Sequence, residues 1–176
     1  LITRQKRYFA TCWFGSNRES FAMWNLYSDS SSVAFKYDFD VFNSLWNEDN
    51  IELNISKNWI NRLYVDKISY IDYLDGQEIF KKKKNIMGLV KDKSYIDEKE
   101  VRVLFKCNGM IHKGKLYERK ISDADIKAIK VSLTNFKKIP LTILFHPEMK
   151  ETHKKNIRLL IAKYGYKNKK SKNSEL

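Results

Sequence analysis

Short apolar runs followed by turn-forming residues constrain the fold of this 176-residue chain more than any other feature of its sequence. Runs rich in aromatic and β-branched residues predict strands. The predicted strands cover residues 7–14, 33–37, 63–70, 101–105, 128–133 and 141–145. The third of these runs is predicted to be a central strand.

Helices are predicted where apolar residues recur every three to four positions. The predicted helices cover residues 19–26, 41–45, 78–87 and 148–164. Because strands and helices do not alternate as regular βαβ units, the sequence favours the α+β class. We expect a mixed, mostly antiparallel sheet with short helices and a long C-terminal helix.

Cap and turn residues predict where several of these elements end. Asp40 is expected to cap the second helix, and Gly88 and Gly165 are expected to end the third and fourth helices. The Asn-Gly pair at residues 108–109 predicts a hairpin turn, with Met110 opening the return strand.

The predicted domain organisation is a single α+β domain, residues 1–166, followed by a basic C-terminal tail, residues 167–176. The tail is rich in lysine and is predicted to be a flexible end. The chain opens with Leu1 rather than methionine. We therefore expect the full-length protein to have an N-terminal segment that this chain lacks.

The net charge of +13 is spread unevenly along the chain. Residues 1–80 carry a net charge of −3, and residues 81–176 carry +16. Such asymmetry is typical of a face that binds nucleic acid or nucleotides, although a high charge also serves solubility alone. The sequence therefore predicts a polyanionic partner for the basic C-terminal half, and leaves solubility as the alternative.

Apolar runs and cysteine content bear on the location of the protein. No apolar run approaches the roughly 20 residues that a membrane-spanning helix needs, so no membrane partner is expected. The two cysteines, Cys12 and Cys107, do not resemble a disulfide framework. We expect two reduced thiols and a cytoplasmic location.

Lys91, Glu98, Glu100 and Arg102 form the most informative charged segment. Two acids that are two residues apart on a strand project from the same face, within about 7 Å of each other. Like charges at this distance raise at least one pKa unless a cation compensates, and Arg102 continues the same face. The alternative interpretation is a ladder of charges on a half-exposed strand.

A second cluster is aromatic and includes Cys12, Trp24 and Tyr27. Tryptophan and tyrosine rings after a strand can stack on a base or on a nicotinamide ring. The alternative is that these rings belong to the hydrophobic core.

Several common sites are disfavoured by the sequence. His112, His146 and His153 lack the spacing of metal ligands, so no metal site is expected. The sequence also lacks the glycine-rich loop of a Rossmann fold, the phosphate-binding loop of ATPases and the nucleophile elbow of α/β-hydrolases.

Four stretches of the chain carry a resemblance to a known family: residues 12–27, 33–35, 91–102 and 164–176. The first contains Cys-Trp, Glu-Ser and Met-Trp-x-x-Tyr, and the third reads Lys-x-x-x-Tyr-x-x-Glu-x-Glu-x-Arg. In these stretches the chain resembles the bacterial domain-of-unknown-function 2971 family. Members of that family usually carry an additional N-terminal segment. The resemblance implies an uncharacterised bacterial protein.

Residues 98–104 are also similar to the Glu-x-Glu strand of ADP-ribosyltransferases. This resemblance implies that Glu100 stabilises the oxocarbenium ion as nicotinamide leaves NAD, and that Glu98 orients or activates the acceptor. NAD would be a substrate, and no other cofactor is implied.

Two hypotheses of function follow from these observations. In the first, the chain is an enzyme that uses NAD: Glu100 and Glu98 are catalytic, and the substrate is bound by Arg102, Lys91, Trp24, Tyr27 and Cys12. In the second, the chain is a non-catalytic module that binds nucleic acid or another protein through its basic half and its aromatic residues.

Overall fold

The computed structural model describes residues 8–54, 60–74, 88–107, 110–112, 115–117, 128–134, 136–166 and 170–176. The chain divides into two compact units, and each is assembled from two separate stretches of sequence. Unit 1 combines Leu1–Gly15 with Ile51–Ser132, and unit 2 combines Ser16–Asn50 with Leu133–Leu176.

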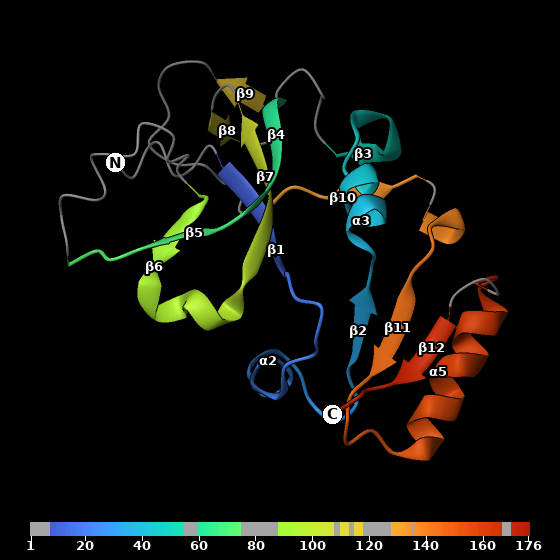
Figure 1. The fold of residues 1–176 in the computed structure, drawn as a ribbon. Coiled ribbons are helices and arrows are strands. Elements are labelled where there is room, and N and C mark those ends of the chain that lie inside the picture. The colour runs from blue at the N-terminus through green and yellow to red at the C-terminus, as the bar shows by residue number, and fades with distance from the viewer. Residues whose placement is uncertain are drawn as a thin grey trace. The chain divides into compact units, whose positions relative to one another are not determined.

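Unit 1 is built on a three-stranded antiparallel sheet with the order β1-β7-β4 (Figure 1). Its strands are β1 (Tyr8–Phe14), β7 (Glu100–Cys107) and β4 (Ile60–Lys67). The central strand β7 is the most deeply buried of the three, and its residues Val103, Leu104 and Phe105 are almost inaccessible to water. Leu104 packs against the small core cluster with Ile68 and Leu89.

Shorter elements surround this sheet. The strand β5 (Ser69–Ile71) pairs in parallel with β6 (Val90–Asp92), and a 3₁₀ helix, η3 (Lys93–Glu98), leads directly into β7. The remaining pairs are β8 (Met110–His112) with β9 (Lys115–Tyr117), and β3 (Ile51–Leu53) with β10 (Val131–Leu133).

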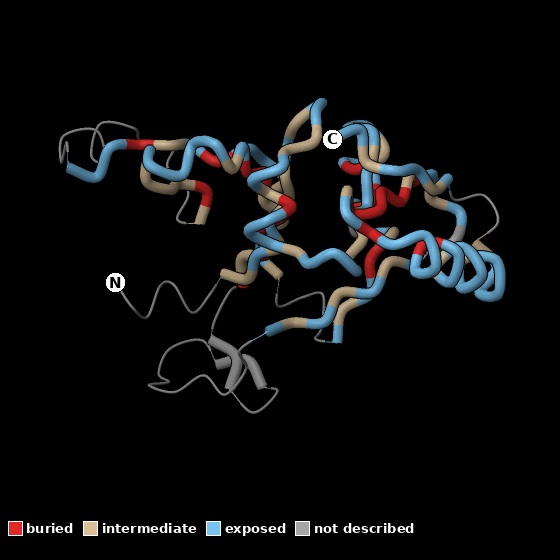
Figure 2. The backbone as a smooth tube through the Cα atoms, turned by 90° about the horizontal axis from the view of Figure 1, so that it is seen from below, coloured by how far each residue is buried: buried red, intermediate tan, exposed pale blue. Residues whose placement is uncertain are grey.

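Unit 2 has a second three-stranded sheet with the order β12-β11-β2, in which β11 runs antiparallel to β2 and parallel to β12. Its strands are β2 (Val33–Lys36), β11 (Thr142–Phe145) and β12 (Lys170–Asn173). The helix α5 (Glu151–Lys163) lies beside this sheet (Figure 1), with most of its residues exposed while β11 is buried (Figure 2). Shorter helices complete the unit: α2 (Phe21–Tyr27), α3 (Phe39–Leu45), η1 (Glu48–Asn50) and η4 (Phe136–Lys138).

The carboxylate of Glu19 connects α2 to the C-terminal end of the chain. It accepts hydrogen bonds from the Trp24 indole N–H at 3.0 Å, the Ser174 hydroxyl at 2.6 Å and the Glu175 backbone N–H at 3.0 Å. Burial raises the pKa of Glu19, but these hydrogen bonds and the charge of Lys36 outweigh it, and the net pKa is lowered. The ionised carboxylate therefore holds residues that are more than 150 positions apart.

The α+β class predicted from the sequence is confirmed, with mixed helices and strands, mostly antiparallel pairing and a C-terminal helix. The strands predicted near residues 7–14, 33–37, 101–105 and 141–145 are present with small changes at their ends. The strand predicted at 128–133 is half as long as expected, because β10 begins only at Val131. Gly165 follows α5 with φ +77°, as expected for a residue that ends a helix. The division into two units does not test whether they form one domain, so the boundaries 1–166 stay a prediction.

Some predicted boundaries are wrong. The predicted strand at 63–70 is two strands, β4 and β5, and the central strand of the sheet is β7. Asp40 lies within the first turn of α3, and Asp38 occupies the cap position. The helix predicted from residue 148 begins at Glu151, because residues 146–149 form a turn closed by a backbone hydrogen bond from Met149 to His146.

The C-terminal segment is not the flexible tail that its lysines predicted. Lys170–Asn173 forms strand β12, and the backbone pairing with β11 orders it despite its low content of strand-forming residues. Glu19 then holds Ser174 and Glu175. The predicted helix at 78–87 and the predicted turn at 108–109 lie outside the described residues. The strand that opens at Met110 pairs with β9.

No helix in the described part of the chain is both long and apolar enough to cross a membrane.

Replacing Glu19 with glutamine is expected to destabilise unit 2. The amide NH₂ group of glutamine cannot accept a hydrogen bond, so at least one of the three donors that bond the Glu19 carboxylate loses its acceptor. Loss of one charge-assisted hydrogen bond is worth about 1 kcal/mol or somewhat more. Urea unfolding at pH 7 measures the loss. The matched control is Glu148→Gln, which removes an exposed acid of the same unit. Equal stability of the two variants would contradict the role assigned to Glu19.

Candidate functional site

A buried ion pair between Glu100 and Arg102 forms the centre of the candidate site in unit 1. The Glu100 side chain is only 5% exposed, and it lies at the start of β7. Arg102 donates from Nε to Oε1 at 2.6 Å and from Nη2 to Oε2 at 3.1 Å. This two-point geometry fixes both side chains along one face of the strand.

Lys91 brings the second acid into the same cluster. Its Nζ atom lies 2.5 Å from Glu98 Oε2 and 3.4 Å from Glu100 Oε2. The ammonium group also lies 4.5 Å from the centre of the Tyr95 ring, which is the arrangement of a cation–π contact. Two cations therefore compensate two carboxylates within a partly buried cluster.

Glu98 and Glu100 meet for a different reason than the one their spacing predicted. Glu98 is the last residue of η3 and is not part of β7, so the two acids do not share one strand face. Lys99 between them adopts a left-handed conformation with φ +42°. This turn, rather than strand alternation, lets both acids reach Lys91. The prediction of a shared strand face was wrong, and the prediction of proximity was right.

The backbone around this turn is held tightly. The Gly15 N–H donates to the Lys99 carbonyl at 2.9 Å. A Cβ atom at Gly15 would lie 2.6 Å from the Val101 side chain, so a larger residue would push the end of β1 away from the turn. Tyr70 accepts a hydrogen bond from the Glu100 backbone N–H at 2.8 Å.

Arg102 is fixed by a third bond, to the backbone at Gly88. Its Nη1 atom donates to the Gly88 carbonyl at 2.7 Å. Gly88 has φ +99°, and a Cβ atom there would meet the Leu104 side chain at 2.9 Å. Glycine is therefore required at this position both for its backbone conformation and for the space beside β7.

Cys12 lies beside this ion pair on the neighbouring strand. It pairs with Arg102 in the register of β1 and β7, and it is exposed. Burial of the sulfur atom, followed by the hydrogen bond and negative charge of Glu100, raises the pKa of the Cys12 thiol, although Arg102 opposes the shift. The site thus presents a protonated thiol at neutral pH.

Electrostatics keep Glu100 ionised. Burial raises its pKa, but hydrogen bonds from Arg102 and Cys12 and the charges of Arg102 and Lys91 outweigh burial, so the net pKa is lowered. Burial also opposes the charge of Lys91, yet its contacts with the two acids raise its net pKa. At neutral pH Glu100 can stabilise a developing positive charge, and it cannot donate a proton.

The aromatic residues predicted for the same site belong to unit 2. Trp24 is buried, its N–H bonds Glu19, and its ring meets that of His146 edge-on at 5.2 Å between centroids. This environment is typical of a core residue. Tyr27 is 66% exposed at the end of α2. That these two rings line a pocket with the acids of unit 1 stays a prediction.

Sequence reasoning missed the supporting residues Tyr70, Gly88 and Tyr95 as members of the site. Their roles depend on how separate elements are placed. Gly88 gave a signal as a glycine at an expected helix end, and Tyr95 gave one as the tyrosine of the Lys-x-x-x-Tyr-x-x-Glu stretch. Among the described residues, no group of three or more histidine, cysteine, aspartate or glutamate side chains could hold a metal ion.

The chain matches no protein-family model, and no curated protein and no solved structure shows significant similarity to it. The resemblance to the domain-of-unknown-function 2971 family stays a prediction.

Glu100→Gln is expected to lower the free energy of unfolding at pH 7 by roughly 2–4 kcal/mol, because Arg102 and Lys91 lose a buried partner while keeping some contact with water. Glu98→Gln is the matched control. Its side chain is 16% exposed and that of its partner, Lys91, is 23% exposed, so the expected loss is about 1 kcal/mol or less.

The pH dependence of the free energy of unfolding follows from the lowered pKa of Glu100 in the folded protein. Its stabilisation is fully present above the unfolded pKa of about 4.3, and it is lost as the pH falls through the lower folded value. Urea unfolding between pH 7 and pH 3 should therefore show a smaller loss of stability in Glu100→Gln than in the wild type. Parallel curves for the two proteins would contradict the ion pair.

Thiol alkylation tests the site from its exposed side. Iodoacetamide at pH 7.5 is expected to modify Cys12 more slowly than an unperturbed cysteine. Modification should be faster in Glu100→Gln, because burial still raises the thiol pKa but Glu100 no longer does, and Arg102 still lowers it. Cys107 is the internal control, because burial raises its pKa to about 11. Its modification would report unfolding. An unchanged Cys12 rate in the folded variant would rule out the proposed coupling.

Proposed function

We propose that unit 1 carries the active site of an enzyme of the domain-of-unknown-function 2971 type that transfers ADP-ribose from NAD. The observation that carries the proposal is a carboxylate, Glu100, that is 5% exposed and held ionised by Arg102 and Lys91. Fixed charges in partly dry sites act more strongly than in water, and they need no rearrangement when charge develops on the substrate.

The proposed reaction breaks the bond between nicotinamide and the anomeric carbon of the ribose, and nicotinamide leaves with the electron pair. Glu100 stabilises the positive charge on that carbon and accepts a hydrogen bond from a ribose hydroxyl. The acceptor nucleophile forms the new bond to the same carbon and gives its proton to Glu98.

Lys91 and Arg102 supply positive charge for the pyrophosphate in this proposal. Both are partly exposed, at 23% and 18%, so each retains a side open to a ligand. Cys12 is proposed to lie at the entrance, in keeping with its exposure. Two free thiols, Cys12 and Cys107, also support a cytoplasmic location as part of the proposal.

The proposal predicts that the protein consumes NAD and releases nicotinamide, or transfers label from NAD to an acceptor. Glu100→Gln should lower the rate at least a hundredfold, because the charge that stabilises the transition state is gone. Glu98→Gln, a milder change for folding, should slow transfer to the acceptor more than loss of nicotinamide.

Two results would overturn the proposal. One is no turnover of NAD by the folded wild-type protein. The other is full turnover by a folded Glu100→Gln protein, with folding checked by circular dichroism and by the protection of Cys107 from alkylation.

A second candidate function is non-catalytic binding of nucleic acid. The specific observation that favours it is the net charge of +16 over residues 81–176. In addition, Lys91 and Arg102 compensate the acids Glu98 and Glu100, so these acids do not repel phosphate strongly. Binding of this kind falls steeply as salt rises, because phosphates release their counterions.

A further inference from the structure

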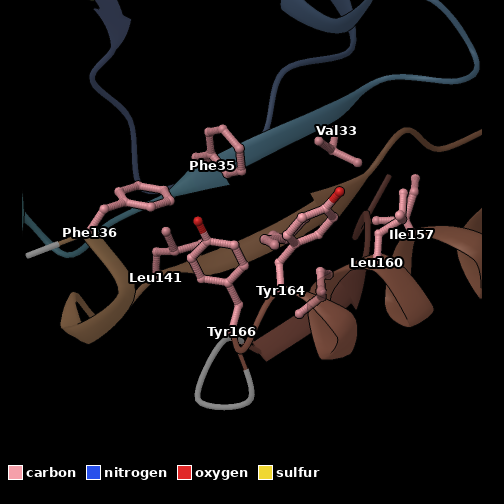
Figure 3. A pocket seen from close by; sticks show the side chains of 10 residues that line it. Val33, Phe35, Phe136, Leu141, Ile157, Leu160, Tyr164 and Tyr166 are labelled. Carbon is pink, nitrogen blue, oxygen red and sulfur yellow. The ribbon is translucent and has the colours of Figure 1, made fainter. Parts of the chain in front are cut away.

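Unit 2 contains an apolar cavity of about 220 Å³ between α5 and the sheet. Its floor includes the buried residues Leu141 and Ile143, and α5 contributes Ile157 and Leu160. Four aromatic rings complete the lining, from Phe35, Phe136, Tyr164 and Tyr166 (Figure 3). None of these residues belongs to the cluster around Glu100.

The four rings are partly open to solvent and do not form a closed hydrophobic core. Phe136 meets Phe35 edge-on at 6.4 Å between centroids and meets Tyr166 edge-on at 5.8 Å. Phe35 is 48% exposed and Tyr164 is 58% exposed, so two faces of the set remain open to a ligand. Figure 3 shows Tyr164 and Tyr166 side by side with their hydroxyl groups toward β2. A flat ring fits this lining better than an aliphatic chain does, because the four aromatic rings offer faces and edges for contacts between rings.

The charge of the elements around the cavity is strongly positive. The elements β2, η4, β11 and α5 together carry seven lysines and arginines and one acid, Glu151. Glu151 is paired with Lys154 at 2.9 Å. The exposed cations Lys36, Lys138 and Lys163 lie within two residues of a lining ring in the sequence. A ligand that combines a flat ring with negative charge is complementary to this surface.

We propose that this cavity binds a nucleobase of single-stranded nucleic acid, with the neighbouring phosphates held by the lysines. Base stacking on aromatic side chains combined with basic surface is the general mode of single-strand binding without sequence preference. The inference gives the second candidate function a specific site, and it does not depend on ADP-ribosyl transfer.

The experiment compares two oligonucleotides of equal length, one of thymidines and one of abasic residues, which carry the same phosphates. Fluorescence anisotropy of each labelled strand is measured with the full chain at 50 and 200 mM salt. The wild type should bind the thymidine strand at least fivefold more tightly than the abasic strand, and both affinities should fall with salt.

Tyr164→Ala and Phe35→Ala should each weaken binding of the thymidine strand by about fivefold to tenfold and leave the abasic strand unchanged. Tyr164→Phe keeps the ring and should bind as the wild type does. Phe39→Ala is the matched control, because Phe39 is 64% exposed in the same unit and does not line the cavity. Both truncated rings are exposed, so these variants should fold.

Three results would overturn the proposal: equal affinity of the wild type for the two strands, no binding at 50 mM salt, or unchanged thymidine binding in both alanine variants. A dimer that forms without regard to nucleic acid, and that Tyr164→Ala abolishes, would also contradict the proposal. That result would assign the cavity to a second copy of the chain. Tyr164→Ala should leave NAD turnover unchanged, so failure of the enzyme proposal and failure of this one are distinguishable.

Discussion

The bidentate ion pair between Glu100 and Arg102 is the interaction on which unit 1 depends. Burying a carboxylate and a guanidinium is costly unless geometry and additional hydrogen bonds compensate. Here the compensation comes from separate elements: Lys91 on β6 contacts the carboxylate, and the Gly88 carbonyl before it accepts from the guanidinium. The Tyr70 hydroxyl on β5 accepts a hydrogen bond from the Glu100 backbone N–H and holds the start of β7. The ion pair therefore fixes the position of β5 and β6 relative to the central strand β7.

This arrangement has two consequences for chemistry. A buried, ionised carboxylate suits stabilisation of positive charge and is unsuited to proton donation. Because the two acids of the cluster are compensated locally, the uncompensated charge of the protein lies elsewhere, largely on lysines of its C-terminal half. The two units thus differ in kind: unit 1 has a preorganised charge cluster, and unit 2 has an apolar, ring-lined cavity between elements with a basic sequence.

The sequence predicted the α+β class, most strands and the proximity of Glu98 to Glu100, because local composition and spacing carry these features. It assigned that proximity to strand alternation, whereas a left-handed Lys99 causes it. Nothing local marks a lysine for that conformation. The hydrogen bonds of Tyr70 and Gly88 and the pairing of β12 with β11 arise from contacts distant in sequence, which one sequence cannot reveal. The cavity was missed for the same reason, since its rings come from three separate segments.

The central claim is that Glu100 remains ionised because Arg102 and Lys91 hold it so. The most direct test is the titration of its side-chain carboxyl carbon by NMR, with the signal assigned by its disappearance in Glu100→Gln. The account predicts a midpoint below the ordinary glutamate value of about 4.3, moving upward in Arg102→Met. A midpoint at or above the ordinary value in the folded wild type would contradict it.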